Sequence, residues 1–538
     1  MKAEKIEVVE LEKGKLDQLL ERAKERLLEE DFVILGKLVH AYLYLLQLIE
    51  YTNYSLAHLR KLIFGSKSEK TSTVFKGQPA ESAAAPPAKG EAAPPKKKPK
   101  GHGRNGADAY ESAEKIEVPH PSLKPGDPCP ECPKGKVYLV EPGILIRVVG
   151  QAPLNATRYD LEKLRCNACE KTFQAPPPPG VGYAKYDETV ASMIALLKYG
   201  SGVPFYRLEG LERNLGVPMP ASTQWDIVAG AVPLVQPAHQ ELIRQAAQGQ
   251  VVHNDDTGMT ILEFGQKKRD GTKEESPDRK GTFTSGVISV NGEHQIALYF
   301  TGHRHAGENL EQLLKQRATD LPPPIQMCDA LSRNVPKEFE TILANCLGHL
   351  RRQFVDVAES FPEECLHLLN TLKAVYINDA IAKEQGMSDE ERLAFHQVNS
   401  GKLMDDLKEW ADNLFNKKLV EPNSGLGAAL NYLLAHWEPL TLFLRQAGAP
   451  LDNNVVERSL KKAILNRKNS MFYKTQNGAR VGDMYMSLIY TAVLAKANPY
   501  DYLNELQRHH KELAENPQDW MPWNYRDTLA RMQTGSSG

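Results

Sequence analysis

The 538-residue sequence has no apolar run long enough to cross a membrane. The nearest candidate, residues 33–49, is interrupted by Lys37, His40 and Gln47, whereas a membrane helix needs about 20 mostly apolar residues. Its first residues also lack the pattern of a signal peptide, because acids and bases occur from the start. We therefore expect a soluble intracellular protein.

The sequence also has no excess of charge of either sign. Its 66 basic and 68 acidic residues leave a net charge of −2. The overall charge thus neither favours nor excludes a polyanionic partner, and any basic surface must be local. The length is well above that of one hydrophobic core, so three or more domains are expected.

Cysteines are few, and their odd number argues against a disulfide framework. Cys328, Cys346 and Cys365 are single, whereas the other four form two Cys-x-x-Cys pairs, Cys129/Cys132 and Cys166/Cys169. Each pair presents two thiolates to one tetrahedral metal. The sequence therefore predicts one structural Zn²⁺ bound by four sulfurs, with no open position for catalysis.

Composition and periodicity divide the chain into segments. We expect a helical, coiled-coil-like region (1–70), a flexible basic linker (71–106), a four-cysteine zinc domain (107–175), a helical region (176–248), an α/β core (249–354), a helical insertion (355–450), a helix that completes the core (451–496) and a C-terminal tail (497–534). Within 1–70, a heptad seam allows either a helical hairpin or self-association; its residues are Ile34, Leu38, Ala41, Leu45 and Leu48.

Two of these segments are candidates for contact with DNA. The linker carries Lys96, Lys97 and Lys98 without a nearby acid, so it is either a soluble spacer or a tether that holds DNA phosphates. In 176–248, a helix at 208–215, a turn at 216–218 and a helix capped by Ser222 resemble a helix-turn-helix. That segment would either bind DNA or pack against the next domain.

Strand patterns begin at residue 250. Residues 250–264 carry Asp255 and Asp256, and the strands 282–290 and 294–300 flank Asn291-Gly292. This dipeptide predicts a hairpin with a type I′ turn, in which both central residues have positive φ. We therefore expect three consecutive antiparallel strands, with two acids on the first.

A helix at about 306–317 and a short strand ending at Asp329 follow. Three strands, a helix and a fourth strand, with acids on the first and fourth, are the layout of a ribonuclease-H-like α/β fold. In that fold the first and fourth strands are neighbours, which would bring Asp255 and Asp329 together. A single aspartate at a strand end is more often a turn or cap residue; two at matching positions favour a site.

A third acid, Glu457, lies in the first turn of a helix that we expect to start at 452–454. Asn454 and Glu457 have the spacing of a capping box, which would stabilise the helix by about 1 kcal/mol without any role in catalysis. However, residues 451–480 contain seven bases and two acids, a local net charge of +5. Such a charge is typical of a helix laid along DNA; the bases are Arg458, Lys461, Lys462, Arg467, Lys468, Lys474 and Arg480.

Cys346 and His349 have the spacing of half a metal site. No second pair is near them in the sequence. We therefore favour a buried structural cluster at this position.

These motifs, in this order, resemble the DDE transposases of the insertion sequence 66 family across nearly the whole chain. The matching segments are 59–70, the two cysteine pairs, 198–200, 204–207, 253–257, 346–352, 452–458, 467–469 and 520–523. The resemblance implies that Asp255, Asp329 and Glu457 are the catalytic acids and that Asp256 is a neighbour rather than a ligand. One departure is Leu331-Ser-Arg after the second acid, where the family commonly has Asp-Ala followed by an aromatic or small residue.

The resemblance implies a multidomain α/β protein: a ribonuclease-H-like core with a helical insertion, a zinc-ribbon-like domain and a helical N-terminal region. Its activity would be cleavage at transposon ends and strand transfer into target DNA. Three carboxylates suit two Mg²⁺ or Mn²⁺ ions, with Asp255 bridging both.

The same resemblance implies partners and a location. DNA would contact Arg458, Lys461, Lys462, Arg467, Lys468 and Lys96 to Lys98, with a homodimer or larger assembly on DNA. Small accessory proteins of the same element are plausible partners, and the bacterial cytoplasm at the nucleoid is the expected location. Two alternatives remain open: an inactive zinc-containing DNA-binding derivative, and a nuclease with the same core.

Overall fold

The computed structural model describes residues 115–131, 135–141, 144–148, 150–167, 170–265 and 281–535, together with residues 23, 24 and 35. The predicted heptad seam and the lysines of the basic linker lie outside these residues. The chain forms two compact units, Pro79–Thr157 and a larger one from Met1–Gln78 and Arg158–Gly538. No helix in the described part combines the length and apolar character that a membrane crossing requires.

In its described residues, the smaller unit has little regular structure. The segment around Cys129 is held by backbone bonds from Cys129 N to Gly135 O and from Val137 N to Asp127 O, both 2.9 Å. Residues 137–141 and 144–148 form no strand, and the pairing in this part of the described chain is the single bridge between Pro128 and Lys136. Side chains such as Leu139 and Leu145 are exposed, so no apolar burial supports a sheet at this place.

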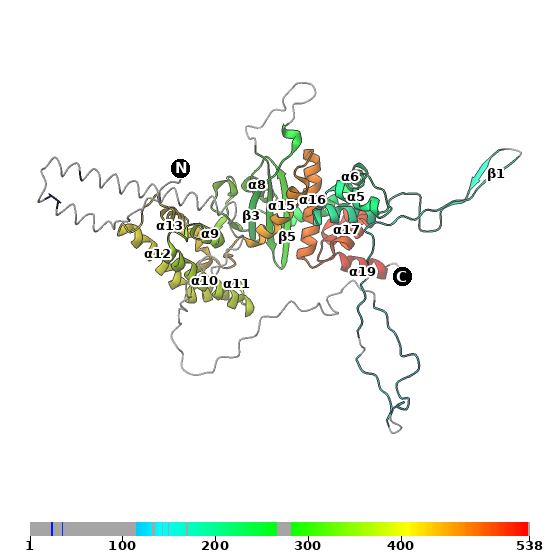
Figure 1. Ribbon diagram of the computed structural model, residues 1–538, viewed down its shortest axis with the longest axis horizontal. Coiled ribbons are helices and arrows are strands. Elements are labelled where there is room, and N and C mark those ends of the chain that lie inside the picture. Colours follow the sequence, from blue (N-terminus) through cyan, green and yellow to red (C-terminus); the bar gives the residue numbers. More distant parts are fainter. Residues whose placement is uncertain are drawn as a thin grey trace, which may run out of the picture. The chain divides into compact units, whose positions relative to one another are not determined.

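The larger unit is built on a five-stranded mixed sheet with the strand order β5-β4-β3-β6-β7 (Figure 1). Its strands are β3 (Val251–Gly258), β4 (Phe283–Asn291), β5 (His294–Gly302), β6 (Ile325–Cys328) and β7 (Ile342–Asn345). The first three are antiparallel, and β6 joins β3 in parallel. The prediction that the first and fourth strands are neighbours is therefore confirmed.

The β4–β5 hairpin is confirmed, but its turn is not the predicted one. Asn291 pairs with His294, so the two turn residues are Gly292 and Glu293. Only Gly292 has positive φ, at 58°, which is the pattern of a type II′ turn rather than type I′. The turn is shifted by one residue because Asn291 remains in the strand, where its amide donates to Gln245 O.

Helix α16 (Gln476–Leu494) covers the open edge of β5. Alternate β5 amides donate to side chains four residues apart on the helix: Ala297 N to Thr491 Oγ1, Tyr299 N to Ser487 Oγ and Thr301 N to Asp483 Oδ2. Two strand residues and four helix residues span similar lengths, about 6–7 Å. The helix thus satisfies an edge that would otherwise be free to pair with another chain.

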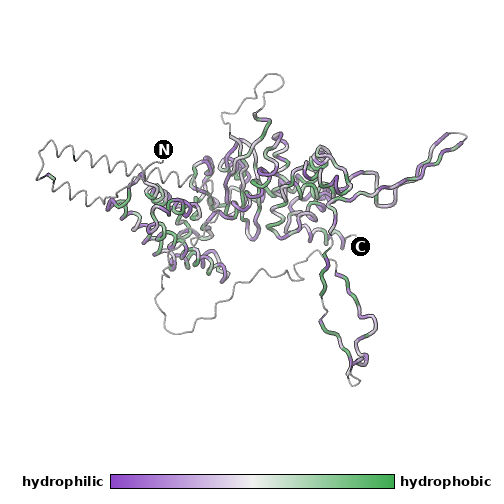
Figure 2. Tube along the Cα trace, in the orientation of Figure 1, coloured by the Kyte–Doolittle hydropathy of each residue, from purple (hydrophilic) through white to green (hydrophobic). Residues whose placement is uncertain are grey.

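Residues 355–450, expected as a helical insertion, are mostly helical. After α9 (Leu347–Val357), which begins before this segment, come α10 (Pro362–Glu384), α11 (Asp389–Asn399), α12 (Gly401–Asn416), α13 (Gly425–Ala435) and α14 (Trp437–Leu440). Apolar side chains of all these helices except α11 share one core with β6 and β7. Hydrophobic and hydrophilic residues interchange over short stretches along these helices (Figure 2), as one-sided burial requires.

A second helical layer precedes β3. It consists of α4 (Glu188–Ala195), the π-helical turn Leu196–Gly200, α5 (Phe205–Asn214), α6 (Ala221–Gly230) and α7 (Val232–Ala246). The two helices of the predicted helix-turn-helix are present as α5 and α6. However, α6 begins at Ala221 after Pro220, so Ser222 is inside the helix and does not cap it.

The C-terminal segment is more ordered than a tail. It forms α17 (Pro499–Arg508), α18 (His510–Glu515) and α19 (Tyr525–Gly535). Tyr502 and Trp520 are buried there, and Tyr502 Oη donates to Trp520 O at 3.0 Å. This segment packs on α4 and α7 and so belongs to the folded unit.

Candidate active site

Asp255 and Asp256 project to opposite faces of the sheet, because consecutive strand residues alternate. Across the β3–β4 ladder, Asp255 pairs with Gly286 and Asp256 with Ser285. Paired residues share a face, so the surroundings of Gly286 and Ser285 identify what lies over each acid.

The face of Asp256 is covered by α8 (Ala306–Leu314). Asn309 of α8 donates to Ser285 Oγ at 2.8 Å. Asp256 is 2% exposed, and it contacts His305 Nδ1 at 2.9 Å and the Arg333 guanidinium at 3.3 Å. Both Asp256 oxygens are thus engaged by protein groups, and its role as a neighbour rather than a ligand stays a prediction.

The face of Asp255 is covered by α15 (Asn454–Ser470). A Cβ atom added to Gly286 would lie 2.9 Å from Leu460 Cδ2 and 3.3 Å from Val456 Cγ2, so the helix sits directly on this glycine. Beside it, Tyr299 Oη donates to Ser459 O at 3.0 Å. Glycine at 286 therefore permits the close approach that brings α15 over Asp255.

The start of α15 is fixed by Asn453. Its backbone N donates to Cys346 Sγ at 3.2 Å, its side-chain amide donates to Asn254 O at 3.1 Å, and its Oδ1 lies 3.1 Å from His253 Nδ1. Burial lowers the pKa of His253 to about 4, so this histidine is neutral and donates to Asn453. These bonds connect α15 to β3 and to the end of β7.

Glu457 does not form the capping box that was considered. The N-cap residue is Asn453, and it makes no side-chain cap bond. Instead, the Glu457 carboxylate lies against Arg352 of α9, with Nη1 3.2 Å from Oε1 and Nη2 2.8 Å from Oε2. Glu457 is therefore directed toward the space between α15 and α9 and not back onto its own helix.

Asp329 follows the last residue of β6, next to β3. Its Oδ1 accepts bonds from the Asn334 side-chain amide and, at 3.3 Å, from Leu331 N. Asn334 in turn accepts bonds at its carbonyl oxygen from Asn254 and Gln326, both 2.7 Å. A buried amide network thus holds the loop after Asp329. The segment Leu331-Ser-Arg, where this sequence differs from the family pattern, places Arg333 against Asp256.

The three predicted acids influence one another electrostatically. The pKa of Asp255 is raised to about 7, chiefly by burial, while the Asp256 backbone N–H lowers it and the negative charges of Asp329, Asp256 and Glu457 raise it further. The charges of Asp329 and Glu457 therefore act on Asp255, while the Glu457 carboxylate is itself paired with Arg352. Carboxylates are oxygen-only donors, which Mg²⁺ prefers.

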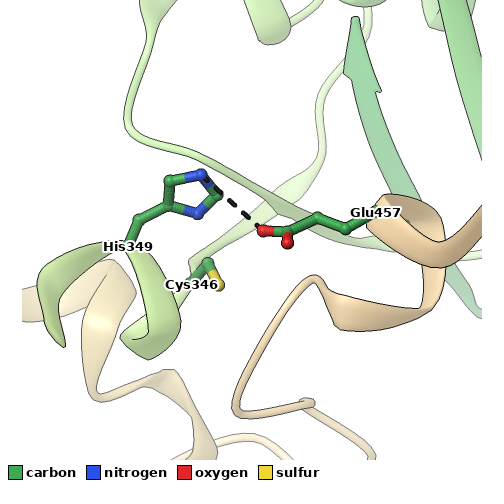
Figure 3. Close-up of side chains that lie close together, drawn as sticks. All are labelled: Cys346, His349 and Glu457. Atoms are coloured by element: carbon green, nitrogen blue, oxygen red, sulfur yellow. Dashed lines mark ion pairs between the residues drawn. The ribbon is translucent and has the colours of Figure 1, made fainter. Parts of the chain in front are cut away.

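The cluster of Cys346, His349 and Glu457 (Figure 3) is the feature that sequence reasoning missed. One ligand atom from each residue lies within 4.8 Å of the others. Cys346 is buried, as the structural interpretation expected. Glu457 comes from a helix more than 100 residues later, which no local spacing could reveal.

The basic residues of α15 have two different environments. Arg458, Lys461 and Lys468 are exposed, and Lys462 is half-buried. Arg467 donates to Thr257 Oγ1 at 3.1 Å and to Gly258 O, so it supports the end of β3. The predicted DNA contacts at Lys96, Lys97 and Lys98 lie outside the described residues.

The four-cysteine zinc site remains a prediction. Cys132 and Cys169 lie outside the described residues, whereas Cys129 and Cys166 are half-buried. The turn at Cys166 is closed by the bond from Glu170 N to Cys166 O at 3.1 Å, between β1 (Lys163–Arg165) and β2 (Thr172–Gln174).

Comparison with known proteins identifies relatives. The model of a family described as "Transposase IS66 family" matches residues 184–481. Among curated proteins of Sinorhizobium fredii (strain NBRC 101917 / NGR234), "Uncharacterized protein y4jD" is 28% identical over 70% of this chain and 73% of its own. A second, "Uncharacterized protein y4hP", is 24% identical over 69% and 68%. No solved structure matches this chain.

Proposed function

The chain belongs to the transposase IS66 family, and on this premise we propose that it is a DDE transposase that cleaves transposon ends and joins them to target DNA. The proposed catalytic acids are Asp255, Asp329 and Glu457. The observation that carries the proposal is the placement of the acids: Asp255 lies on β3, Asp329 follows the adjacent parallel strand β6, and Glu457 lies on α15, which packs on Gly286 opposite Asp255. Carboxylates drawn from these elements would suit a divalent cation.

The strand order supports a ribonuclease-H-like core. Three antiparallel strands are followed by α8 and by β6, which is parallel to β3. In this arrangement the first and second acids come from adjacent strands, and the third comes from a helix packed across them. The amide network of Asn254, Gln326 and Asn334 would then position the loop of Asp329, while Asn453 positions Glu457.

We propose two Mg²⁺ or Mn²⁺ ions as cofactors, which Asp255, Asp329 and Glu457 would hold. Ions so placed can activate a water or a 3′-hydroxyl and stabilise the leaving oxygen. The chain contributes by orienting the carboxylates: the Asp256 N–H holds Asp255 Oδ1 at 2.8 Å, and the Asn334 amide holds Asp329.

DNA is the proposed partner, and the exposed Arg458, Lys461 and Lys468 are the proposed phosphate contacts. A structural Zn²⁺ at Cys129, Cys132, Cys166 and Cys169 would stabilise a zinc-ribbon-like fold. Assembly of two or more copies on DNA, and a contribution of accessory proteins, belong to the same proposal.

The test is an Mg²⁺-dependent cleavage and joining assay on the element's own ends, with uncut and pre-cut 3′-OH substrates. Asp255→Ala, Asp329→Ala and Glu457→Ala should each abolish both reactions while end binding persists. Asp405→Asn, a change of an exposed acid on α12, is the control and should remain active. Joining by any of the three alanine variants would refute the assignment.

The same assay separates the two alternatives. A nuclease would cut uncut ends but would not join the pre-cut 3′-OH end. An inactive DNA-binding derivative would bind ends and perform neither reaction in the unsubstituted chain.

A further inference from the structure

Cys346, His349 and Glu457 lie together where the start of α9 faces the first turn of α15 (Figure 3). Cys346 precedes α9 as its N-cap residue, and His349 follows in the first turn of that helix. The pair is therefore presented by one helical turn, and Glu457 approaches from the other helix. The Cys346 side is closed to solvent, while His349 and Glu457 are each about a quarter exposed, at 24% and 23%.

The guanidinium of Arg352 lies next to both His349 and Glu457. Arg352 Nη1 lies 3.2 Å from His349 Nε2 and 3.2 Å from Glu457 Oε1. Because a guanidinium only donates, His349 Nε2 must carry a lone pair, which is the state that binds a metal. The two acceptor atoms are 3.8 Å apart.

The donor set identifies the class of ion. Sulfur, imidazole nitrogen and carboxylate oxygen together suit Zn²⁺ and similar ions, whereas Mg²⁺ takes oxygen ligands. Ligand bonds of about 2.0–2.3 Å in a tetrahedron set donor atoms about 3.5 Å apart. The His349–Glu457 separation of 3.8 Å is close to this value, and the sulfur lies within 4.8 Å of a ligand atom of each partner.

We propose that Cys346, His349 and Glu457 form a site for a thiophilic divalent cation such as Zn²⁺, which displaces the Arg352 guanidinium. Binding replaces the S–H bond of Cys346 by a sulfur–metal bond, and one proton leaves to solvent. Arg352 moves out to solvent, and a water molecule completes the four-coordinate sphere. The open water position and the loss of an existing ion pair make this a reversible site rather than a structural one.

Such a site has a consequence for Glu457 that rests on the proposed function. One carboxylate would serve two sites of different chemistry, an oxygen site with Asp255 and Asp329 and a sulfur–nitrogen site with Cys346 and His349. A Zn²⁺ ion at the second site would withdraw Glu457 from the first. The chain would then be inhibited by thiophilic cations at saturating Mg²⁺.

The test is Co²⁺ binding to the full-length protein, followed by absorption. A thiolate ligand gives a near-ultraviolet charge-transfer band, and tetrahedral coordination gives strong visible bands. The four-cysteine site would also contribute, so the signal is the difference between the unsubstituted chain and Cys346→Ser. Cys365→Ser is the matched control, because this cysteine is equally buried but lies on α10, away from the cluster.

The expected result is a thiolate band that the unsubstituted chain and Cys365→Ser share and that Cys346→Ser lacks, so the band appears in the difference between the unsubstituted chain and Cys346→Ser. His349→Asn should weaken Co²⁺ binding at least about tenfold. Arg352→Gln should strengthen it, because the competing cation is gone. Misfolding could only weaken Co²⁺ binding. A gain of affinity in Arg352→Gln together with a loss in His349→Asn would therefore come from the site itself.

Identical spectra for the unsubstituted chain and Cys346→Ser would overturn the proposal, as would unchanged Co²⁺ affinity in His349→Asn. These outcomes would not refute the proposed transposase activity, which is tested separately by Asp255→Ala and Asp329→Ala in the joining assay. Conversely, a chain that neither cleaved nor joined DNA would refute the proposed function. A Co²⁺ band that depends on Cys346 would still support the metal site.

Discussion

Arg352 binds both carboxylate oxygens of Glu457, and this pair links α9 to α15 across 105 residues of sequence. A two-pronged guanidinium contact is stronger and more directional than a single ion pair. Since Glu457 is also the proposed third catalytic acid, Arg352 and any metal ion compete for the same oxygens.

We predict that Arg352→Gln increases Mn²⁺ affinity several-fold. Both side chains are partly exposed, so the ion pair contributes about 1 kcal/mol and its loss changes binding by a comparable amount. Titration with Mn²⁺, followed by electron paramagnetic resonance, measures the effect. Arg445→Gln, which breaks the Arg445–Glu438 pair, is the control and should not change the affinity. Equal affinities in all three chains would show that Arg352 does not compete.

The raised pKa of Asp255 makes the stability of the metal-free chain depend on pH. Its pKa in the folded chain is about 7, against an ordinary value of 3.8. Between about pH 4 and pH 7 the folded chain therefore holds a proton that the unfolded chain has released. The free energy of unfolding should fall as pH rises through this window.

Asp255→Asn removes that dependence, because the amide stays neutral. In EDTA the variant should be about 1–3 kcal/mol more stable than the unsubstituted chain at pH 7.5, and the difference should shrink at pH 5. Urea unfolding at the two pH values measures it. A difference that is the same at both values would contradict the assigned cause.

Gly286 offers a test of how closely α15 must approach the sheet. A Cβ at this position would lie 2.9 Å from Leu460 Cδ2, so Gly286→Ala should push the helix away. We expect a loss of about 1–3 kcal/mol in stability and a fall in DNA joining. Gly210→Ala is the control, because a Cβ there meets nothing within 4 Å.

A double-mutant cycle identifies the cause. Leu460→Ala removes the side chain that the new methyl group would meet, so Gly286→Ala should cost less in that background. Equal costs in both backgrounds would place the strain elsewhere.

The sequence predicts where the strands lie along the chain, because alternation, turns and strand-end acids are local properties. Local patterns offered Asp255, Asp256, Asp329 and Glu457 as candidate acids, and the resemblance chose Asp255 over Asp256. The adjacency of β3 and β6 followed from the order of elements. The contacts that position these acids could not be predicted. The pairing of Arg352 with Glu457 and the approach of Leu460 to Gly286 arise only when distant segments pack.

Two further contacts depend on distant segments in the same way. Asn454 and Glu457 have the spacing of a capping box, which was the alternative to a site, but the Glu457 carboxylate binds Arg352 instead. Arg467 was predicted to contact DNA, which stays a prediction, and its bonds to Thr257 and Gly258 could not be read from the sequence.

The two kinds of basic residue on α15 can be separated by salt dependence. Lys461 is exposed, so Lys461→Gln should weaken DNA binding for all sequences and reduce the slope of log affinity against log salt by about 0.9. Arg467→Gln should instead lower the melting temperature, because its bonds to the end of β3 are lost. Filter binding at several salt concentrations and thermal unfolding measure the two effects. If Lys461→Gln left the slope unchanged while Arg467→Gln reduced it without loss of stability, the proposed DNA-facing side of α15 would be wrong, and the phosphates would lie toward β3.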